Sequence, residues 1–209
     1  MARRGKEATR ERILEAAEDV FSQKGYHDSL MDDIATTSKT SKGALYFHFP
    51  SKESLFFALL ERLAAKLERD VAREIERRAG AVAKIEGALE AVLASLSKRR
   101  RLAQILLRQG YGLCPAFEDK RLELFDRFAV LIQGVLDEAV AEGSLAPLDA
   151  RLTAYAWLGA LNEVVTRWLL RGEPHPLNDA LPALLPLFLR GVGVDPDSGD
   201  ALRQEKPRS

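Results

Sequence analysis

Residues 9–60 contain two short helical segments around a tight turn, and this pattern constrains the fold more than any other part of the chain. An amphipathic helix comes first, with apolar residues at helical spacing on one face: Ile13, Ala16, Ala17, Val20 and Phe21. Gly25 is expected to end this helix, because glycine tolerates the left-handed backbone of a helix end. Ser29 is placed to cap the first short helix, with Asp32 and Asp33 in its first turn.

The second short helix is predicted from Lys42 to about Phe47, with Ser41 as its N-cap. Leu45 is expected to point into the core, and the helix would turn its other side outward. Pro50 then breaks the chain, and residues 51–54 give a capped, acidic start to a longer helix. The whole segment therefore predicts a helix-turn-helix, in which the outward side of the second short helix would face DNA.

The run KTSKGALYFHFPSKESL, residues 39–55, resembles the DNA-binding domain of the TetR family of bacterial repressors, whose usual pattern is close to GVSKGTLYxHFxSKExL. The resemblance implies a dimer that binds double-stranded DNA at a palindromic operator. It also implies the set of DNA-contacting residues, in which Gly43 and Ala44 would allow close approach to the bases. That set is Ser29, Thr40, Ser41, Lys42, Gly43, Ala44, Tyr46, Phe47, His48 and Lys52.

Two positions depart from the family pattern. Lys39 stands where the family has its turn glycine, so it must either adopt a left-handed backbone at some cost or the turn must differ. Asp32 stands at the family's frequent arginine, so that phosphate contact is expected to be absent or turned away from the duplex.

Charge is unevenly distributed along a chain whose formal net charge is zero. Residues 36–52 contain three lysines and no acid, and five of the first 12 residues are Arg or Lys. A neutral chain with pI near 6.9 is not an indiscriminate polyanion binder. Together with the helix-turn-helix, these stretches instead predict a basic edge that faces phosphates, although either stretch alone would be read as solvated charge.

The rest of the chain continues as helices with short breaks, so the fold class predicted is all-α with about nine helices. The predicted organisation is a basic arm at 1–8, the helix-turn-helix domain at 9–50, a helical effector-binding and dimerisation body at 51–194, and a disordered tail at 195–209. The helices expected in the body cover residues 55–78, 81–98, 102–107, 118–142, 149–170 and 178–189. The last two have apolar residues on more than one face, which favours a homodimer over closure of the monomer's own core.

The body is expected to hold a small apolar effector. Residues 105–109 and 159–168 are similar to segments of TetR-type repressors of fatty-acid degradation, and that resemblance implies a long-chain acyl-CoA. Arg108, with Arg99, Arg100 and Arg101 before it, would bind the phosphates, although a solvated basic turn is an equal alternative. The predicted effector-binding residues are Leu106, Arg108, Gln109, Tyr111, Phe117, Phe125, Phe128, Tyr155, Leu158, Asn162 and Trp168.

Three other functions stay open. A multidrug or aromatic-compound sensor of the same family would use the same aromatic residues, with an acid such as Glu163 facing a cationic ligand. A nucleoid or division factor would bind DNA with no effector. An acyl-transfer enzyme with Cys114 as nucleophile would need a nearby base, and the three histidines lie far from it along the chain, so no enzyme is expected.

The single cysteine excludes an internal disulfide and is consistent with a reducing cytosol. No metal cluster or cofactor motif appears in the sequence. The charged first residues and the absence of a run of roughly 20 apolar residues predict neither export nor membrane attachment. We therefore expect a protein of the bacterial cytoplasm.

Overall fold

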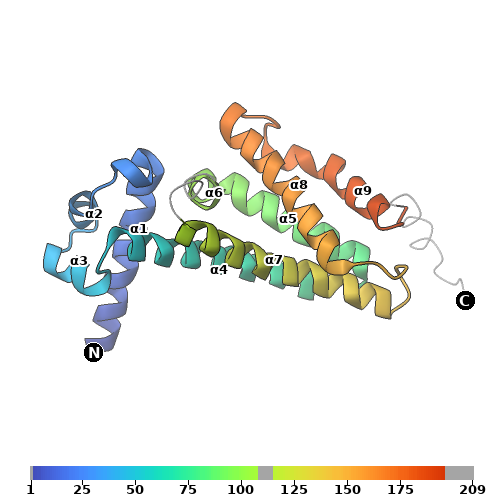
Figure 1. Cartoon of the computed structure of the whole chain (residues 1–209), viewed down its shortest axis with the longest axis horizontal. Helices are drawn as coiled ribbons and strands as arrows, with labels where there is room; N and C mark the ends of the chain where they lie inside the picture. The colour runs from blue at the N-terminus through green and yellow to red at the C-terminus, as the bar shows by residue number, and fades with distance from the viewer. Residues whose placement is uncertain (1, 108–114, 196–209) are drawn as a thin grey trace, which may run out of the picture. The chain divides into compact units, whose positions relative to one another are not determined.

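The structure is a computed structural model that describes residues 2–107 and 115–195. Within these ranges it has helices and no strand, so the predicted all-α class is confirmed (Figure 1). The elements are α1 (Ala2–Asp28), α2 (Met31–Thr37), α3 (Lys42–His48), α4 (Lys52–Arg77), α5 (Ala81–Lys98), α6 (Arg100–Leu107), α7 (Pro115–Ala141), α8 (Ala150–Arg171), the 3₁₀ turn η1 (Leu177–Ala180) and α9 (Leu181–Gly191). The predicted tail lies almost entirely outside the described residues.

The chain divides into two compact units. We call Met1–Leu67 with Lys98–Leu124 the head unit, and Glu68–Ser97 with Phe125–Ser209 the body unit. The sequence prediction placed a boundary near residue 50, whereas the start of α4, all of α6 and the start of α7 belong to the head unit. The two long helices α4 and α7 therefore each contribute residues to both units.

The core of the head unit is aromatic. Phe21 and Phe56 are fully buried and meet edge to face, with ring centroids 5.1 Å apart. Phe117, near the start of α7, packs against Phe57 at 4.9 Å and Phe56 at 5.2 Å. Such pairs contribute about 0.5–1.5 kcal/mol beyond the area that they bury. The prediction that Phe117 binds an effector is therefore corrected, because its ring, 3% exposed, is part of the head core.

Most helix ends follow the local sequence signals. Gly25 has φ 81° and ψ 170° and interrupts α1 where the sequence predicts its end. Asp149 caps α8 by accepting a hydrogen bond from the backbone N–H of Leu152, and Gly172, with φ 78°, ends that helix. The last helix differs from the prediction, because it opens as the 3₁₀ turn η1. Pro182 then follows in the first turn of α9, where its missing N–H costs no hydrogen bond.

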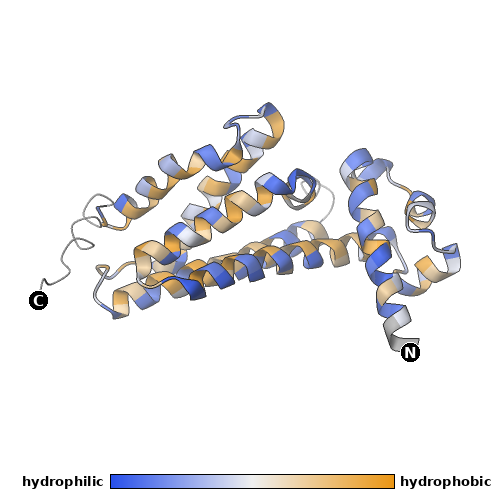
Figure 2. Cartoon of the chain, turned by 180° about the vertical axis from the view of Figure 1, so that it is seen from behind, coloured by the Kyte–Doolittle hydropathy of each residue, from blue (hydrophilic) through white to orange (hydrophobic). Residues whose placement is uncertain are grey.

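The body unit consists of packed helices, and hydrophobic and hydrophilic residues alternate around each helix (Figure 2). Buried residues from every long helix of this unit form its core, among them Val71, Leu93, Leu136, Val165 and Leu189. In the described part of the chain, no helix has the combination of length and apolarity that spanning a membrane requires.

Candidate functional site

The second helix of the helix-turn-helix, α3, is held by one buried side chain and exposes most of the others. Ser41 is its N-cap and accepts a hydrogen bond from the backbone N–H of Ala44, at 3.2 Å, as predicted. Leu45 is 0% exposed, whereas Tyr46 and Phe47 are 47% and 68% exposed. Lys42 and Gly43 are also exposed, and Ala44 is half-buried. The outward side of α3 therefore carries a lysine and two small residues at its start and aromatic rings at its end.

The turn between α2 and α3 has the strained backbone that the sequence allowed as one of two outcomes. Lys39 has φ 54°, the left-handed conformation that glycine adopts more easily, and it is the only non-glycine residue with positive φ in the described ranges. The hydroxyls of Ser38 and Thr40 are hydrogen-bonded to each other at 2.8 Å. Thr40, predicted to contact DNA, thus lies half-buried in the turn.

Asp32 forms an ion pair with Lys42 across the two short helices. The distance between the Lys42 Nζ and Asp32 Oδ2 atoms is 2.6 Å, and both side chains are more than half exposed. The hydrogen bond from Lys42 to this carboxylate raises the pKa of Lys42. The neighbouring Asp33 binds other groups, because it accepts hydrogen bonds from Lys24 at 2.8 Å and from the backbone N–H of Leu30 at 3.2 Å. Those contacts lower the pKa of Asp33.

Residues near the start of α1 contact the aromatic end of α3. The Lys6 Nζ lies 4.7 Å from the ring centroid of Phe47, and the Arg10 guanidinium lies 5.3 Å from that of Phe49. Burial lowers the pKa of His48, and the positive charges of Lys6 and Arg10 lower it further. A neutral imidazole and two cations therefore gather at this end of α3.

Two residues predicted to contact DNA have other partners. Ser29 is fully buried, and its hydroxyl donates to the Gly25 carbonyl at 2.5 Å, so it neither caps α2, whose N-cap is Leu30, nor reaches a phosphate. The Lys52 Nζ atom donates to the carbonyls of Tyr26, His27 and Ser29 at 2.8, 3.2 and 3.0 Å. An ammonium has three N–H groups, so these bonds use all of them inside the head unit.

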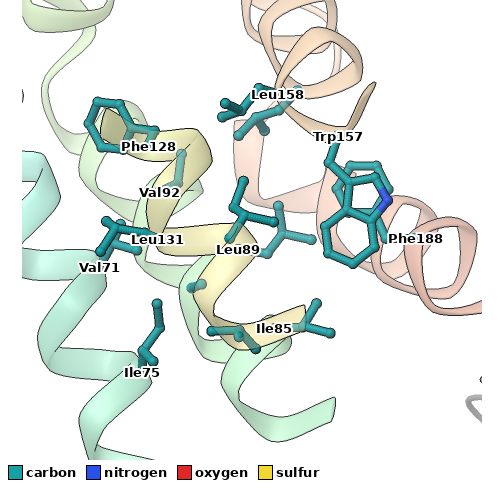
Figure 3. A pocket seen from close by; sticks show the side chains of 14 residues that line it. Val71, Ile75, Ile85, Leu89, Val92, Phe128, Leu131, Trp157, Leu158 and Phe188 are labelled. Atoms are coloured by element: carbon teal, nitrogen blue, oxygen red, sulfur yellow. The ribbon is translucent and has the colours of Figure 1, made fainter. Parts of the chain in front are cut away.

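The body unit contains a pocket that opens among five helices (Figure 3). The space among its lining residues amounts to about 610 Å³ when the part open to solvent is included. Figure 3 shows Val71 and Ile75 of α4 on one side and the stacked rings of Trp157 and Phe188, 4.8 Å apart, on the other. The lining is Val71, Ile75, Ile85, Ala88, Leu89, Val92, Phe128, Leu131, Ile132, Val135, Trp157, Leu158, Leu161 and Phe188.

Only some predicted effector residues belong to this pocket. Phe128 and Leu158 line it, whereas Phe125 and Asn162, both half-buried in the body unit, and the buried Trp168 are not among its lining residues. The Asn162 Oδ1 atom is buried without a hydrogen-bond partner. Arg108, Gln109 and Tyr111 lie outside the described residues, as does Cys114, and so does the side chain of Leu106. Of the basic run, Arg101 pairs with Asp19 at 2.5 Å inside the head unit.

The prediction that Tyr155 binds the effector is corrected, because Tyr155 lies at the surface. Its side chain is 38% exposed, and its hydroxyl donates to Asp126 Oδ1 at 2.9 Å and accepts from Arg151 Nε at 3.1 Å. Sequence reasoning did not place the aliphatic residues of α4 and α5 in the pocket. Their only signal was apolar spacing, which core residues share.

The multidrug alternative named Glu163 as an acid that faces a cationic ligand, but Glu163 is exposed and pairs with Arg167 at 2.6 Å, one turn along α8. None of the pocket-lining residues is charged. A buried carboxylate for a cation is thus absent from the lining that the structure describes.

Comparisons with known proteins agree with this architecture. A family model for "Bacterial regulatory proteins, tetR family" matches residues 13–59, and one for "Tetracyclin repressor-like, C-terminal domain" matches residues 78–190. The fatty acid metabolism regulator protein of Bacillus subtilis (strain 168) is 25% identical over 184 residues, covering 86% of this chain and 93% of its own. The HTH-type transcriptional regulator SrpR of Pseudomonas putida is 31% identical over 166 residues, covering 79% and 76%.

A solved structure described as the transcriptional regulator FadR from Bacillus subtilis in complex with stearoyl-CoA superposes with a TM-score of 0.81. The match covers 87% of this chain and 98% of that one at 23% identity, which shows a common fold. The two family models together cover the helix-turn-helix and most of the body, and the chain belongs to the TetR family of bacterial regulatory proteins.

Proposed function

We propose that this TetR-family transcriptional regulator is a dimeric repressor that binds a palindromic operator in the cytoplasm and is released by a small effector with a long apolar chain, most specifically a long-chain acyl-CoA. The observation that carries this proposal is the pocket of the body unit, whose 14 lining residues are all apolar. An alkyl chain needs no polar partner, and its burial contributes about 0.8 kcal/mol per methylene. The affinity of the pocket should therefore rise with chain length until the space is filled.

Relatives support the chemistry of the effector. A protein of the same fold has been solved with stearoyl-CoA, and a relative with 25% identity is named for fatty acid metabolism. The free acid and the CoA thioester share the alkyl chain, so the pocket alone is compatible with both.

The dimer is supported by apolar side chains left exposed on the last two helices. Leu152, Leu170 and Leu187 are 65%, 59% and 61% exposed, and all three lie on α8 or α9. These two helices lie side by side in the body unit (Figure 1). A second copy related by a two-fold axis would bury these residues and provide two recognition helices for two half-sites.

Release of DNA would use α4. This helix carries the head-core residues Leu55, Phe56 and Leu59 in its first turns and the pocket residues Val71 and Ile75 further along. An effector that binds more tightly when α4 adopts one position than another shifts the population toward that position. In this state the two head units of the dimer would not match the spacing of the operator half-sites. A coupling free energy of about 1–3 kcal/mol is typical for such systems.

The test is a competition assay with the full-length protein on its own upstream DNA. Acyl-CoAs of increasing chain length, free fatty acids and cationic dyes are added, and Val92→Phe, which fills the pocket, is compared with Val130→Phe, the same change at a position that is 65% exposed. We expect release by long-chain acyl-CoA from the wild-type and Val130→Phe proteins, and retention by Val92→Phe.

Operator affinity that stays unchanged at saturating acyl-CoA, while the compound demonstrably binds, would overturn the effector proposal. Release by dyes alone would support the multidrug sensor instead. Binding to scattered genomic sites that no compound affects would support a nucleoid or division factor.

A further inference from the structure

The ion pair between Asp32 and Lys42 lies on the side of the head unit that carries the exposed residues of α3. Asp32 is in the first turn of α2 and Lys42 is the first residue of α3, so the pair spans the turn of the helix-turn-helix. The Lys42 and Asp32 side chains are 67% and 57% exposed, which leaves both accessible to DNA. Asp33, by contrast, is bound to Lys24 and to the N-cap of α2, and it holds α2 rather than α3.

As folded, α3 presents no net charge. Its sequence, KGALYFH, contains one permanent charge, on Lys42, and the Asp32 carboxylate neutralises it. His48 at the other end has a lowered pKa because of burial and the nearby cations Lys6 and Arg10, against which only Glu7 acts in the opposite sense. Attraction between α3 and the polyanion is therefore weak until Lys42 leaves Asp32.

We propose that Asp32 is a specificity-determining residue, which suppresses binding to non-operator DNA by holding the ammonium of Lys42. Binding without sequence preference arises almost entirely from cations that neutralise phosphates. On such DNA the pair stays closed and Lys42 contributes nothing. On the operator, contacts along the exposed side of α3 fix the helix against the duplex, and Lys42 then exchanges the carboxylate for a phosphate.

This inference rests on the DNA-binding part of the proposed function and is independent of the effector. Asp32→Asn removes the charge and keeps the shape, so it should strengthen binding to non-operator DNA. One additional phosphate contact is worth about fivefold at 0.15 M salt and makes the slope of log K against log salt steeper by about 0.9. The ratio of operator to non-operator affinity should fall by about the same factor.

The matched control is Glu15→Gln, which makes the same change in net charge at an exposed position of α1. Each variant is measured on operator and on random-sequence DNA by fluorescence anisotropy over a series of salt concentrations. The midpoint of urea unfolding checks that both variants fold. Asp32→Asn should increase the affinity for random-sequence DNA and the steepness of log K against log salt. Glu15→Gln should change neither quantity, apart from a small increase in affinity that is the same for both DNAs.

A double-mutant cycle provides the decisive comparison. The double variant Asp32→Asn/Lys42→Gln lacks both charges of the pair. It should bind random-sequence DNA with the affinity and salt slope of the wild type, about fivefold more weakly than Asp32→Asn. A double variant whose slope of log K against log salt is shallower than that of the wild type by about 0.9, or equal effects of Asp32→Asn and Glu15→Gln, would overturn the proposal. Failure of the wild-type protein to bind any DNA would instead refute the DNA-binding assignment itself.

Discussion

The guanidinium of Arg78 occupies the space that a side chain on Gly87 would need. A Cβ atom at residue 87 would lie 2.5 Å from Arg78 Nε and 2.7 Å from its Cδ. Gly87 is buried in the middle of α5, and its missing side chain lets Arg78 reach Glu86 at 3.4 Å and Glu90 at 2.5 Å. Gly87 weakens the helix, but its missing side chain makes room for the contacts of Arg78 that connect the end of α4 to α5.

Gly87→Ala should therefore fail to stabilise the body unit, although alanine is favoured over glycine in a helix interior by about 1 kcal/mol. The new methyl group displaces Arg78, and two part-exposed ion pairs of about 0.5–1 kcal/mol each are lost, which equals or exceeds this gain. We expect a net change in the free energy of unfolding between zero and about 1 kcal/mol of destabilisation. Urea unfolding followed by tryptophan emission reports on this unit, because Trp157 and Trp168 both lie in it.

The control for Gly87→Ala is the same change in an Arg78→Ala background. With no guanidinium to displace, the alanine should now stabilise by about 1 kcal/mol. Equal effects of Gly87→Ala in the two backgrounds would show that the contact between residues 78 and 87 is unimportant.

Features that depend on neighbours in the chain were predictable from the sequence. Ser41 and Asp149 cap helices because a side-chain oxygen lies three residues before a free N–H, and this geometry is local. Leu45 is buried because the periodicity of a short helix leaves one position for an anchor. The left-handed backbone at Lys39 is one of the two outcomes predicted from the family's glycine at this position.

Features that depend on distant partners were not predictable. Lys52 bonds to carbonyls 23 to 26 residues earlier, and Phe117 packs on rings of α1 and α4. No local pattern distinguishes such a lysine from a phosphate contact, or such a phenylalanine from a pocket residue. The pocket is likewise formed by five helices, and apolar spacing predicts the buried side of each but not the space left among them.

Lys39→Gly should stabilise the turn before α3. The left-handed backbone costs a residue with a Cβ about 1–2 kcal/mol, and the greater freedom of glycine in the unfolded chain offsets part of this gain. We expect the free energy of local opening, measured by hydrogen exchange of α3 amides, to rise by about 0.5–1 kcal/mol. Lys39→Ala keeps the Cβ and should show no gain. A glycine variant no more protected than the alanine variant would contradict the strain at this position.

Lys52→Met should destabilise the head unit without changing the salt dependence of DNA binding. The ammonium binds three carbonyls at the end of α1 and lies 4.6 Å from the centre of the Tyr26 ring. Hydrogen bonds from a charged donor contribute about 1.5–3 kcal/mol, and partial exposure reduces this to roughly 1–2 kcal/mol here. Calorimetry measures the loss, with Lys66→Met, an exposed position on the same helix, as the control. A stable variant whose slope of log K against log salt falls by about one would restore Lys52 as a phosphate contact.

The stability of the head unit should decrease as the pH falls below 6.5. His48 has a folded-state pKa below its usual 6.5, first because of burial and then because of Lys6 and Arg10. Well above pH 6.5 the imidazole is neutral in both states. Between that value and the lower folded pKa, the unfolded chain binds a proton that the folded head does not, which favours unfolding. His48→Gln should remove this part of the pH dependence in calorimetric scans. A dependence that remains equally steep in the variant would contradict its assignment to His48.

Trp157 should report directly on occupancy of the pocket, since its ring lines the pocket and stacks on Phe188 with an interplanar angle of 10°. Trp168 is buried on the same helix but is not a lining residue. In a Trp168→Phe protein, an alkyl chain that displaces water from beside Trp157 should shift the emission to shorter wavelength, more so for longer chains. Trp157→Phe should abolish the shift while Trp168 still emits. A shift that persists in Trp157→Phe and disappears in Trp168→Phe would place the bound chain elsewhere in the body unit.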